Sequence, residues 1–131
     1  MKAVAYSIQP FEKEFLAIAN HKKHEITLIT NPLNFDTITY AAGKEGIIVS
    51  AADLVSVDII KILAGLHIKY IISRSATIDQ AAAARCGITI ANAGLPATGA
   101  PQETADQMIK ELDLFQITEA GLKASKKMNF H

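Results

Sequence analysis

Six residues of this 131-residue chain stand just after short apolar runs, and their types suit the binding of a small anion. They are Ser50, Ser73, Arg74, Ser75, Ala76 and Thr77. Arginine can hold a carboxylate through two parallel hydrogen bonds, and free N–H groups at the start of a helix also attract anions. If the Arg74 side chain turns inward, these residues form a candidate anion edge. The alternative is that Arg74 pairs with an acid on the surface, while Ser73 and Ser75 only cap backbone groups.

Other side chains that could do chemistry do not form a recognisable constellation. No histidine has a Ser, Cys or carboxylate at a spacing typical of catalysis or metal binding, so we expect all four to be solvated surface residues. They are His21, His24, His67 and His131. Cys86 is the only cysteine, which excludes an internal disulfide and fits a reducing compartment. We expect it to be buried at a helix end, and we assign no catalytic residue and no metal ligand.

The chain also lacks the signature of a nucleotide site. The sequence G-x-G-x-x-G, which brings backbone close to a pyrophosphate, does not occur. Gly94 and Gly99 have the spacing of half a P-loop, but Ala100-Pro101 follow where lysine and a hydroxyl residue would bind phosphate and metal. We expect a plain turn there and no cofactor.

Composition excludes two classes of partner. Half of the residues are hydrophobic, and 13 basic side chains balance 13 acidic ones. Because no field of one sign is available, we expect neither nucleic acid nor an anionic membrane as a partner. The apolar run at the N-terminus is too short for a secretory signal or a membrane span, so we expect a soluble cytoplasmic protein.

Five apolar runs alternate with helical patterns, which predicts parallel strands joined by crossover helices. The expected strands are Lys2–Ile8, Ile26–Thr30, Ile47–Val49, Ile68–Ile72 and Ile88–Ala91. The expected helices begin at Pro10, Asp36, Ser56, Thr77 and Pro101. The pattern predicts an α/β, flavodoxin-like three-layer domain with a five-stranded parallel sheet in the order 2-1-3-4-5. Loops after the strands then meet at one edge, where open α/β sheets bind ligands.

The four segments that we expect at this ligand edge follow the first, third, fourth and fifth strands. They are residues 7–9, 50–53, 73–77 and 92–96. Two features of the helices are also predicted. Thr77 should cap the helix that ends at Gly87, and the helix from Pro101 should break near Gln116–Thr118, with a last short helix from Thr118.

The string IKYIISRSA…IDQAAAARCGITIANAGLP resembles a segment of the D-2-hydroxyacid dehydrogenases, the family of D-lactate dehydrogenase. In that family an apolar strand, an Arg, small residues, Ile-Asp, an Ala-rich helix and Gly-Ile lead to the last strand of the substrate-binding domain. The string APQETADQMI likewise resembles the family's Ser-Pro helix, which leads into the cofactor domain. One departure matters. Between Ala76 and Ile78 the family has several residues, including a Gly whose amide helps to hold the substrate carboxylate, whereas this chain has only Thr77.

The resemblance implies two alternative functions. The first is a stand-alone substrate-binding domain without dehydrogenase activity by itself, which binds a small 2-hydroxy or 2-oxo acid or serves as an interaction module. The second is a subunit of a D-2-hydroxyacid dehydrogenase whose NAD-binding domain is supplied by another chain. The family's catalytic Arg, Glu and His lie in that cofactor domain, so none is carried over to this sequence.

The last segment raises the question of association. We expect residues 1–100 to form the flavodoxin-like domain and residues 101–131 to form a helical extension. Its apolar residues are spread around much of the helical circumference, so they must pack on the chain's own sheet or against a second copy. They are Met108, Ile109, Leu112, Leu114 and Phe115. We expect a homodimer with Ile109, Leu112 and Phe115 near the centre of its seam.

Overall fold

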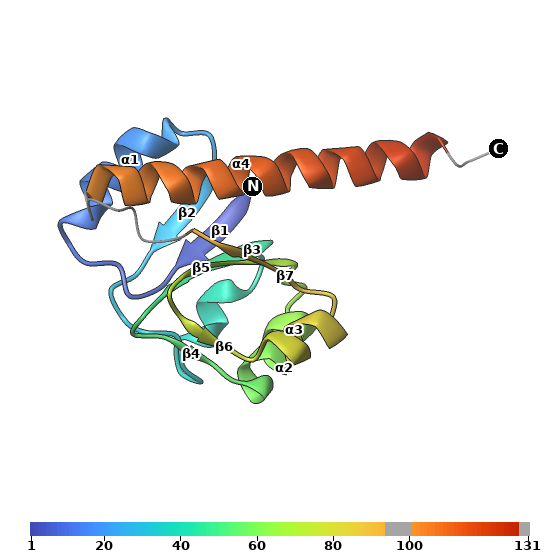
Figure 1. Cartoon of the computed structure of the whole chain (residues 1–131), viewed down its shortest axis with the longest axis horizontal. Helices are drawn as coiled ribbons and strands as arrows, with labels where there is room; N and C mark the ends of the chain where they lie inside the picture. The colour runs from blue at the N-terminus through green and yellow to red at the C-terminus, as the bar shows by residue number, and fades with distance from the viewer. Residues whose placement is uncertain (94–100, 129–131) are drawn as a thin grey trace.

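The computed structural model describes residues 1–93 and 101–128, with side chains described as far as Gly121. Five parallel strands form the central sheet in the order β2-β1-β3-β5-β7 (Figure 1). They are β1 (Lys2–Ala5), β2 (Glu25–Leu28), β3 (Gly46–Ser50), β5 (Tyr70–Arg74) and β7 (Thr89–Asn92). Numbered along the chain within this sheet, the order is 2-1-3-4-5, so the predicted flavodoxin-like topology is confirmed.

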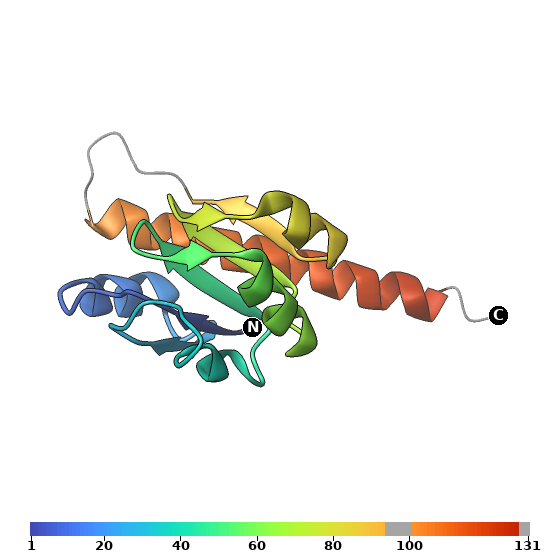
Figure 2. The ribbon, with the colours of Figure 1, turned by 90° about the horizontal axis from the view of Figure 1, so that it is seen from below.

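Helices cover both faces of the sheet. On one face lie α1 (Glu12–Asn20) and α4 (Pro101–Met128), and on the other lie the 3-10 helix η1 (Ile38–Ala41), α2 (Val57–Gly65) and α3 (Gln80–Arg85). Figure 2, seen from below, shows α2 and α3 in front of the strands and α4 running behind them. Successive residues of β5 pack in the two cores, Ile71 beneath α2 and α3, and Ile72 beneath α1 and α4. This burial on both faces explains why the strand shows no polar alternation.

Helix α2 begins at the predicted position, with Ser56 as its N-cap, whereas the predicted cap of α3 is wrong. Ser56 accepts a hydrogen bond from the Ile59 backbone N–H at 3.4 Å. In α3 the cap is Asp79, whose carboxylate accepts from Ala82 N–H at 3.0 Å. Thr77 instead lies in the short strand β6 (Thr77–Ile78), which pairs in parallel with β4 (Leu54–Val55). This small second sheet was not predicted, because two-residue strands carry no periodic signal.

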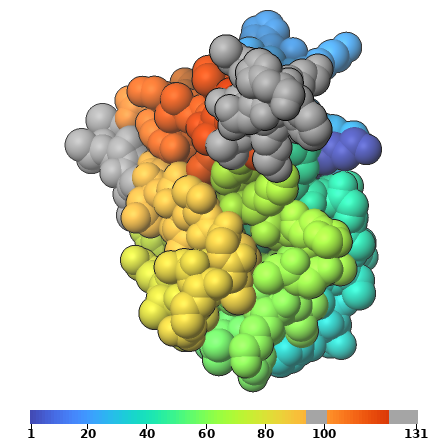
Figure 3. Space-filling model, turned by 90° about the vertical axis from the view of Figure 1, so that its right-hand side faces the viewer, coloured from blue at the N-terminus to red at the C-terminus, as the bar shows by residue number. Residues whose placement is uncertain are grey.

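The predicted break in the last helix is also wrong, because α4 runs without interruption from Pro101 to Met128. Thr118 fits within the helix because its hydroxyl donates a hydrogen bond to the Leu114 carbonyl, one turn earlier, at 2.9 Å. Figure 3, which faces the end towards which α4 runs, shows α4 in orange above the yellow and green segments of the body.

Helix α4 packs on the sheet of its own chain. Met108, Ile109, Leu112 and Phe115 are buried in one cluster with Ile72 and Ala5 of the strands, and the Phe115 ring stacks on Tyr70 with centroids 4.2 Å apart. Of the two arrangements that we expected, the structure shows the helix folded back. A dimer seam centred on Ile109, Leu112 and Phe115 is therefore wrong, since these side chains form part of the core.

A polar anchor holds the same helix further along. Glu119 is buried on α4 and accepts hydrogen bonds from Tyr70 Oη at 2.5 Å and from Lys69 Nζ at 2.6 Å. Burial, together with the Glu119 hydrogen bond and charge, raises the pKa of Tyr70 to about 12. The tyrosine therefore stays neutral and donates to the carboxylate, which fixes α4 against the start of β5.

Candidate functional site at the carboxyl edge

The sheet brings together part of the predicted anion edge. Ser50 ends β3 and Arg74 ends β5, and the two residues are direct neighbours in the parallel register. Ser73 is buried, and its hydroxyl accepts a hydrogen bond from Ala76 N–H at 3.0 Å. Ser75 and Thr77 are exposed, and Ser75 has a left-handed φ of 67°. The predicted residues therefore divide into a buried group, Ser73 and Arg74, and an exposed turn, with the half-buried Ser50 beside Arg74.

The Asp53 side chain connects three segments at this edge. Its carboxylate is buried and accepts hydrogen bonds from Ser7 Oγ at 2.8 Å, Leu33 N–H at 2.9 Å and Ser50 N–H at 2.8 Å. These donors follow β1, follow β2 and end β3, so one side chain ties three loops together. The Asp53 backbone carbonyl also accepts from Thr77 N–H at 3.3 Å. This carboxylate is saturated with donors, which makes it a structural group rather than a ligand site.

A buried tyrosine lies close to this carboxylate. Tyr6 is fully buried and donates its hydroxyl to the Thr37 carbonyl at 3.0 Å. Burial and the nearby Asp53 charge raise its pKa well above the ordinary value. Tyr6 therefore stays neutral at physiological pH and serves in packing, because its raised pKa makes it a poor general acid.

Arg74 is the positive group of the edge. Its side chain is only 8% exposed, and Nη1 donates to the Glu12 carboxylate at 2.5 Å. Glu12, the first residue of α1, also accepts from Gln9 N–H at 2.9 Å. Arg74 therefore pairs with an acid, as in our alternative reading, but the pair is buried rather than on the surface. Arg74 Nε is buried as well, and it has no hydrogen-bond partner among the residues that the structure describes.

The two residues that complete the edge, Glu12 and Asp53, were not among the predicted site residues. An acid in the first turn of the helix after β1 was the available signal for Glu12, since such acids favour the positive end of a helix. Nothing in the sequence indicates that it contacts Arg74, which lies 62 positions away. Asp53 stood in a predicted ligand loop, but its donors come from three separate segments.

Part of the predicted edge lies outside the described residues. Asn92 ends β7 and Ala93 is buried, whereas residues 94–100, which include the expected turn from Gly94 to Gly99, are not described.

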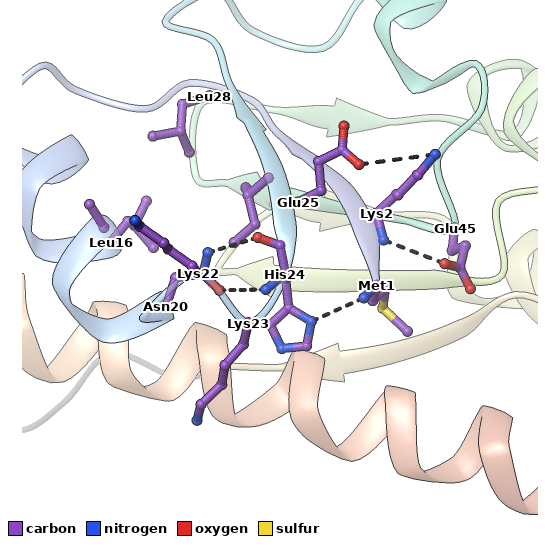
Figure 4. A pocket seen from close by; sticks show the side chains of 12 residues that line it. Met1, Lys2, Leu16, Asn20, Lys22, Lys23, His24, Glu25, Leu28 and Glu45 are labelled. Atoms are coloured by element: carbon purple, nitrogen blue, oxygen red, sulfur yellow. Dashed lines mark hydrogen bonds and ion pairs between the residues drawn. The ribbon is translucent and has the colours of Figure 1, made fainter.

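A groove lies at the opposite, amino edge of the sheet, between α1 and the edge strand β2. It has a volume of about 720 Å³ and includes Leu16, Asn20, His24 and Ile26 in its lining. Figure 4 shows the Asn20 side chain hydrogen-bonded to the backbone of His24: Nδ2 donates to the carbonyl and Oδ1 accepts from the N–H. The His24 imidazole points towards α4 and Met1.

His24 corrects the expectation that the histidines are solvated. Its side chain is 0% exposed, and Nε2 lies 2.7 Å from Asp113 Oδ1 of α4. Its Nδ1 lies 3.3 Å from the Met1 nitrogen. His24 therefore joins the loop before β2 to α4.

Cys86 corrects a second expectation, because it is exposed rather than buried.

Metal chemistry and membrane insertion find no support in the described segments. Within residues 1–93 and 101–121, no three His, Cys, Asp or Glu side chains converge as ligands of a metal ion. None of the described helices is both long enough and apolar enough to cross a bilayer.

The fold and the edge together define a parallel α/β domain whose carboxyl edge carries the buried guanidinium of Arg74. No family model and no curated protein matches the chain, but solved structures do. D-lactate dehydrogenase from Escherichia coli matches at 24% identity with a TM-score of 0.66, over 70% of this chain and 30% of that enzyme. The Salmonella D-lactate dehydrogenase is 26% identical with a TM-score of 0.66, over 70% and 29%. A D-2-hydroxyisocaproate dehydrogenase is 24% identical with a TM-score of 0.64, over 74% and 30%.

These matches confirm the resemblance that the sequence indicated. The chain has the fold of a partial domain of D-2-hydroxyacid dehydrogenases and spans about 30% of the length of the dehydrogenases that it matches.

Proposed function

We propose that this chain is a substrate-binding-type domain that binds a small 2-hydroxy or 2-oxo acid and has no dehydrogenase activity by itself. The observation that carries the proposal is Arg74, a guanidinium that is only 8% exposed at the carboxyl edge of the sheet. Open α/β sheets bind their ligands at this edge. The similarity to dehydrogenases named for D-lactate and D-2-hydroxyisocaproate supports an acid of this class.

The energetics of Arg74 favour a binding role over a purely structural one. Burying a guanidinium costs several kcal/mol unless its donors are paired. Glu12 neutralises the charge, but Nε remains without a partner in the described part of the chain. An unsatisfied buried donor costs about 1–3 kcal/mol, and a ligand acceptor could recover this energy.

Thermal unfolding with added acids tests the binding proposal. Pyruvate or D-lactate at ten times its Kd should stabilise the fold by about 1.4 kcal/mol, which corresponds to a rise in Tm of roughly 3–6 °C for a chain of this size. Arg74→Lys keeps the charge but loses the planar fork, so we expect binding to weaken about tenfold or more. The matched control is Arg85→Lys, at an exposed position in the last turn of α3. A flat response to every acid would refute the proposal.

The lack of dehydrogenase activity follows from chemistry that this chain does not carry. Hydride transfer in the resembled family needs a dinucleotide-binding unit, and the G-x-G-x-x-G sequence is missing here. The purified chain with NADH and pyruvate, 2-oxoglutarate or hydroxypyruvate should show no loss of NADH absorbance. Steady oxidation of NADH would contradict this part of the proposal and favour the alternative of an active subunit.

A homodimer remains part of the proposal, with its seam moved to the outer face of α4. Leu114 is 48% exposed and Ile117 is 68% exposed, on the side of the helix away from the buried residues.

We also propose a cytoplasmic location, since the single, exposed Cys86 suits a reducing compartment.

A further inference from the structure

The Glu12 carboxylate lies in the position that a ligand carboxylate at Arg74 would take. One oxygen accepts the Gln9 N–H at 2.9 Å, and the other accepts Arg74 Nη1 at 2.5 Å. The first turn of α1, at the positive end of the helix dipole, holds this group, which is 14% exposed. An external carboxylate needs the same donors, because it also has two oxygens and one negative charge.

The arrangement differs from a saturated structural ion pair. Asp53, at the same edge, accepts three hydrogen bonds of 2.9 Å or less and belongs to none of the ion pairs seen among the described residues. Arg74, in contrast, keeps a buried Nε without a partner in the described residues even while Glu12 is in place. Glu12 therefore neutralises the guanidinium without satisfying all of its donors.

Glu12 and a bound acid exclude each other. Two carboxylates around one buried guanidinium would repel each other where water screens them poorly. A ligand can enter only when Glu12 leaves its position on Arg74.

We propose that Glu12 is a built-in competitor, and that a small monocarboxylate binds between Gln9 N–H and Arg74 by displacing it. This inference rests on the proposed acid-binding function and adds to it the location of the carboxylate and a limit on affinity. The bound acid is held on the α1 side of the sheet by Arg74 and Gln9, rather than by the exposed turn at Ser75.

Two substitutions of Glu12 and one control test the displacement. Glu12→Gln keeps the size of the side chain and an oxygen for Gln9 N–H but removes the charge. Glu12→Asp keeps the charge and withdraws the carboxylate by one methylene. The control is Glu14→Gln, a change to the other acid in the first turn of α1, which is exposed.

Calorimetric titration with pyruvate gives the deciding comparison. We expect Glu12→Gln to bind pyruvate at least about tenfold more tightly than the unmodified chain, with Glu14→Gln unchanged. If Glu12→Gln does not fold, as judged by circular dichroism, Glu12→Asp must show the same direction of change.

The outcomes separate this inference from the proposed function. Equal affinity in the unmodified chain and the Glu12 variants, with loss in Arg74→Lys, would overturn the competitor and leave acid binding intact. No binding by any variant would overturn both.

Discussion

Single buried polar groups determine the shape of the carboxyl edge. Asp53 satisfies donors from three loops, and Arg74 with Glu12 joins the end of β5 to the start of α1. Each carboxylate has at least one partner far away in the sequence, Ser7 for Asp53 and Arg74 for Glu12. Residue types at the ends of strands were enough to single out Ser73 and Arg74. They could not show that Glu12 neutralises Arg74, because that contact depends on how α1 crosses the sheet.

Removal of the Asp53 carboxylate should be costly. Asp53→Ala would leave the buried Leu33 N–H and the partly buried Ser50 N–H without their acceptor, so we expect a loss of about 3–5 kcal/mol in the free energy of unfolding. Urea denaturation measures this loss, and Asp36→Ala, at an exposed position, should change stability by less than about 0.5 kcal/mol. Equal stability of the two variants would show that the network does not hold the loops.

Tyr70 predicts a pH dependence of stability. Its pKa in the folded state is about 12, above the ordinary tyrosine value of 10.0. The neutral form is therefore favoured by folding, and this contribution is fully present below pH 10 and is lost as the pH rises towards 12. Between these values the unmodified chain should lose stability more steeply than Tyr70→Phe. Denaturant titrations of both proteins at several pH values give the difference, and identical slopes would contradict the assignment.

At the scale of elements, α4 departs most from what the sequence suggests. A single apolar stripe predicts one packed face, but the residues from Met108 to Phe115 include both core and exposed positions. Leu112 and Leu114 lie two positions apart, so they face opposite sides of the helix. The sequence alone does not tell which of these sides packs on the sheet, where Leu112 is buried and Leu114 is half-exposed. Strands β3 and β5 were predictable because each is a short run rich in branched residues and buried on both faces.

Two substitutions on α4 distinguish core from seam. Leu112 is 1% exposed, so Leu112→Asp should cost about 4 kcal/mol or more and unfold the domain rather than dissociate it. Ile117→Asp should leave the fold intact and convert a dimer into a monomer. Light scattering coupled to size-exclusion chromatography, with circular dichroism for folding, measures both effects. A mass near 14.1 kDa for the unmodified chain at all concentrations would remove the homodimer from the proposal.

At the scale of the whole molecule, the sheet has two candidate ligand sites, one at each edge. The carboxyl edge has the buried guanidinium, whereas the amino edge has the groove of about 720 Å³ beside His24 and Ile26. The lysines of this groove are partly engaged, since Lys23 pairs with Asp113 and Lys2 with Glu25. Order of strands and position of the loops were predictable from the alternation of elements. The groove was not, because it depends on how α1 lies beside β2 in space.

The location of acid binding tests the central claim most directly. Titration of the ¹⁵N-labelled chain with pyruvate, followed by NMR, reports each backbone amide and the Arg74 Nε–H. We predict that saturable shifts concentrate at Arg74 Nε–H, Gln9 and residues 73–76, and that they disappear in Arg74→Lys. Shifts confined to Asn20, His24 and Ile26 would place the ligand in the amino-edge groove and contradict the account.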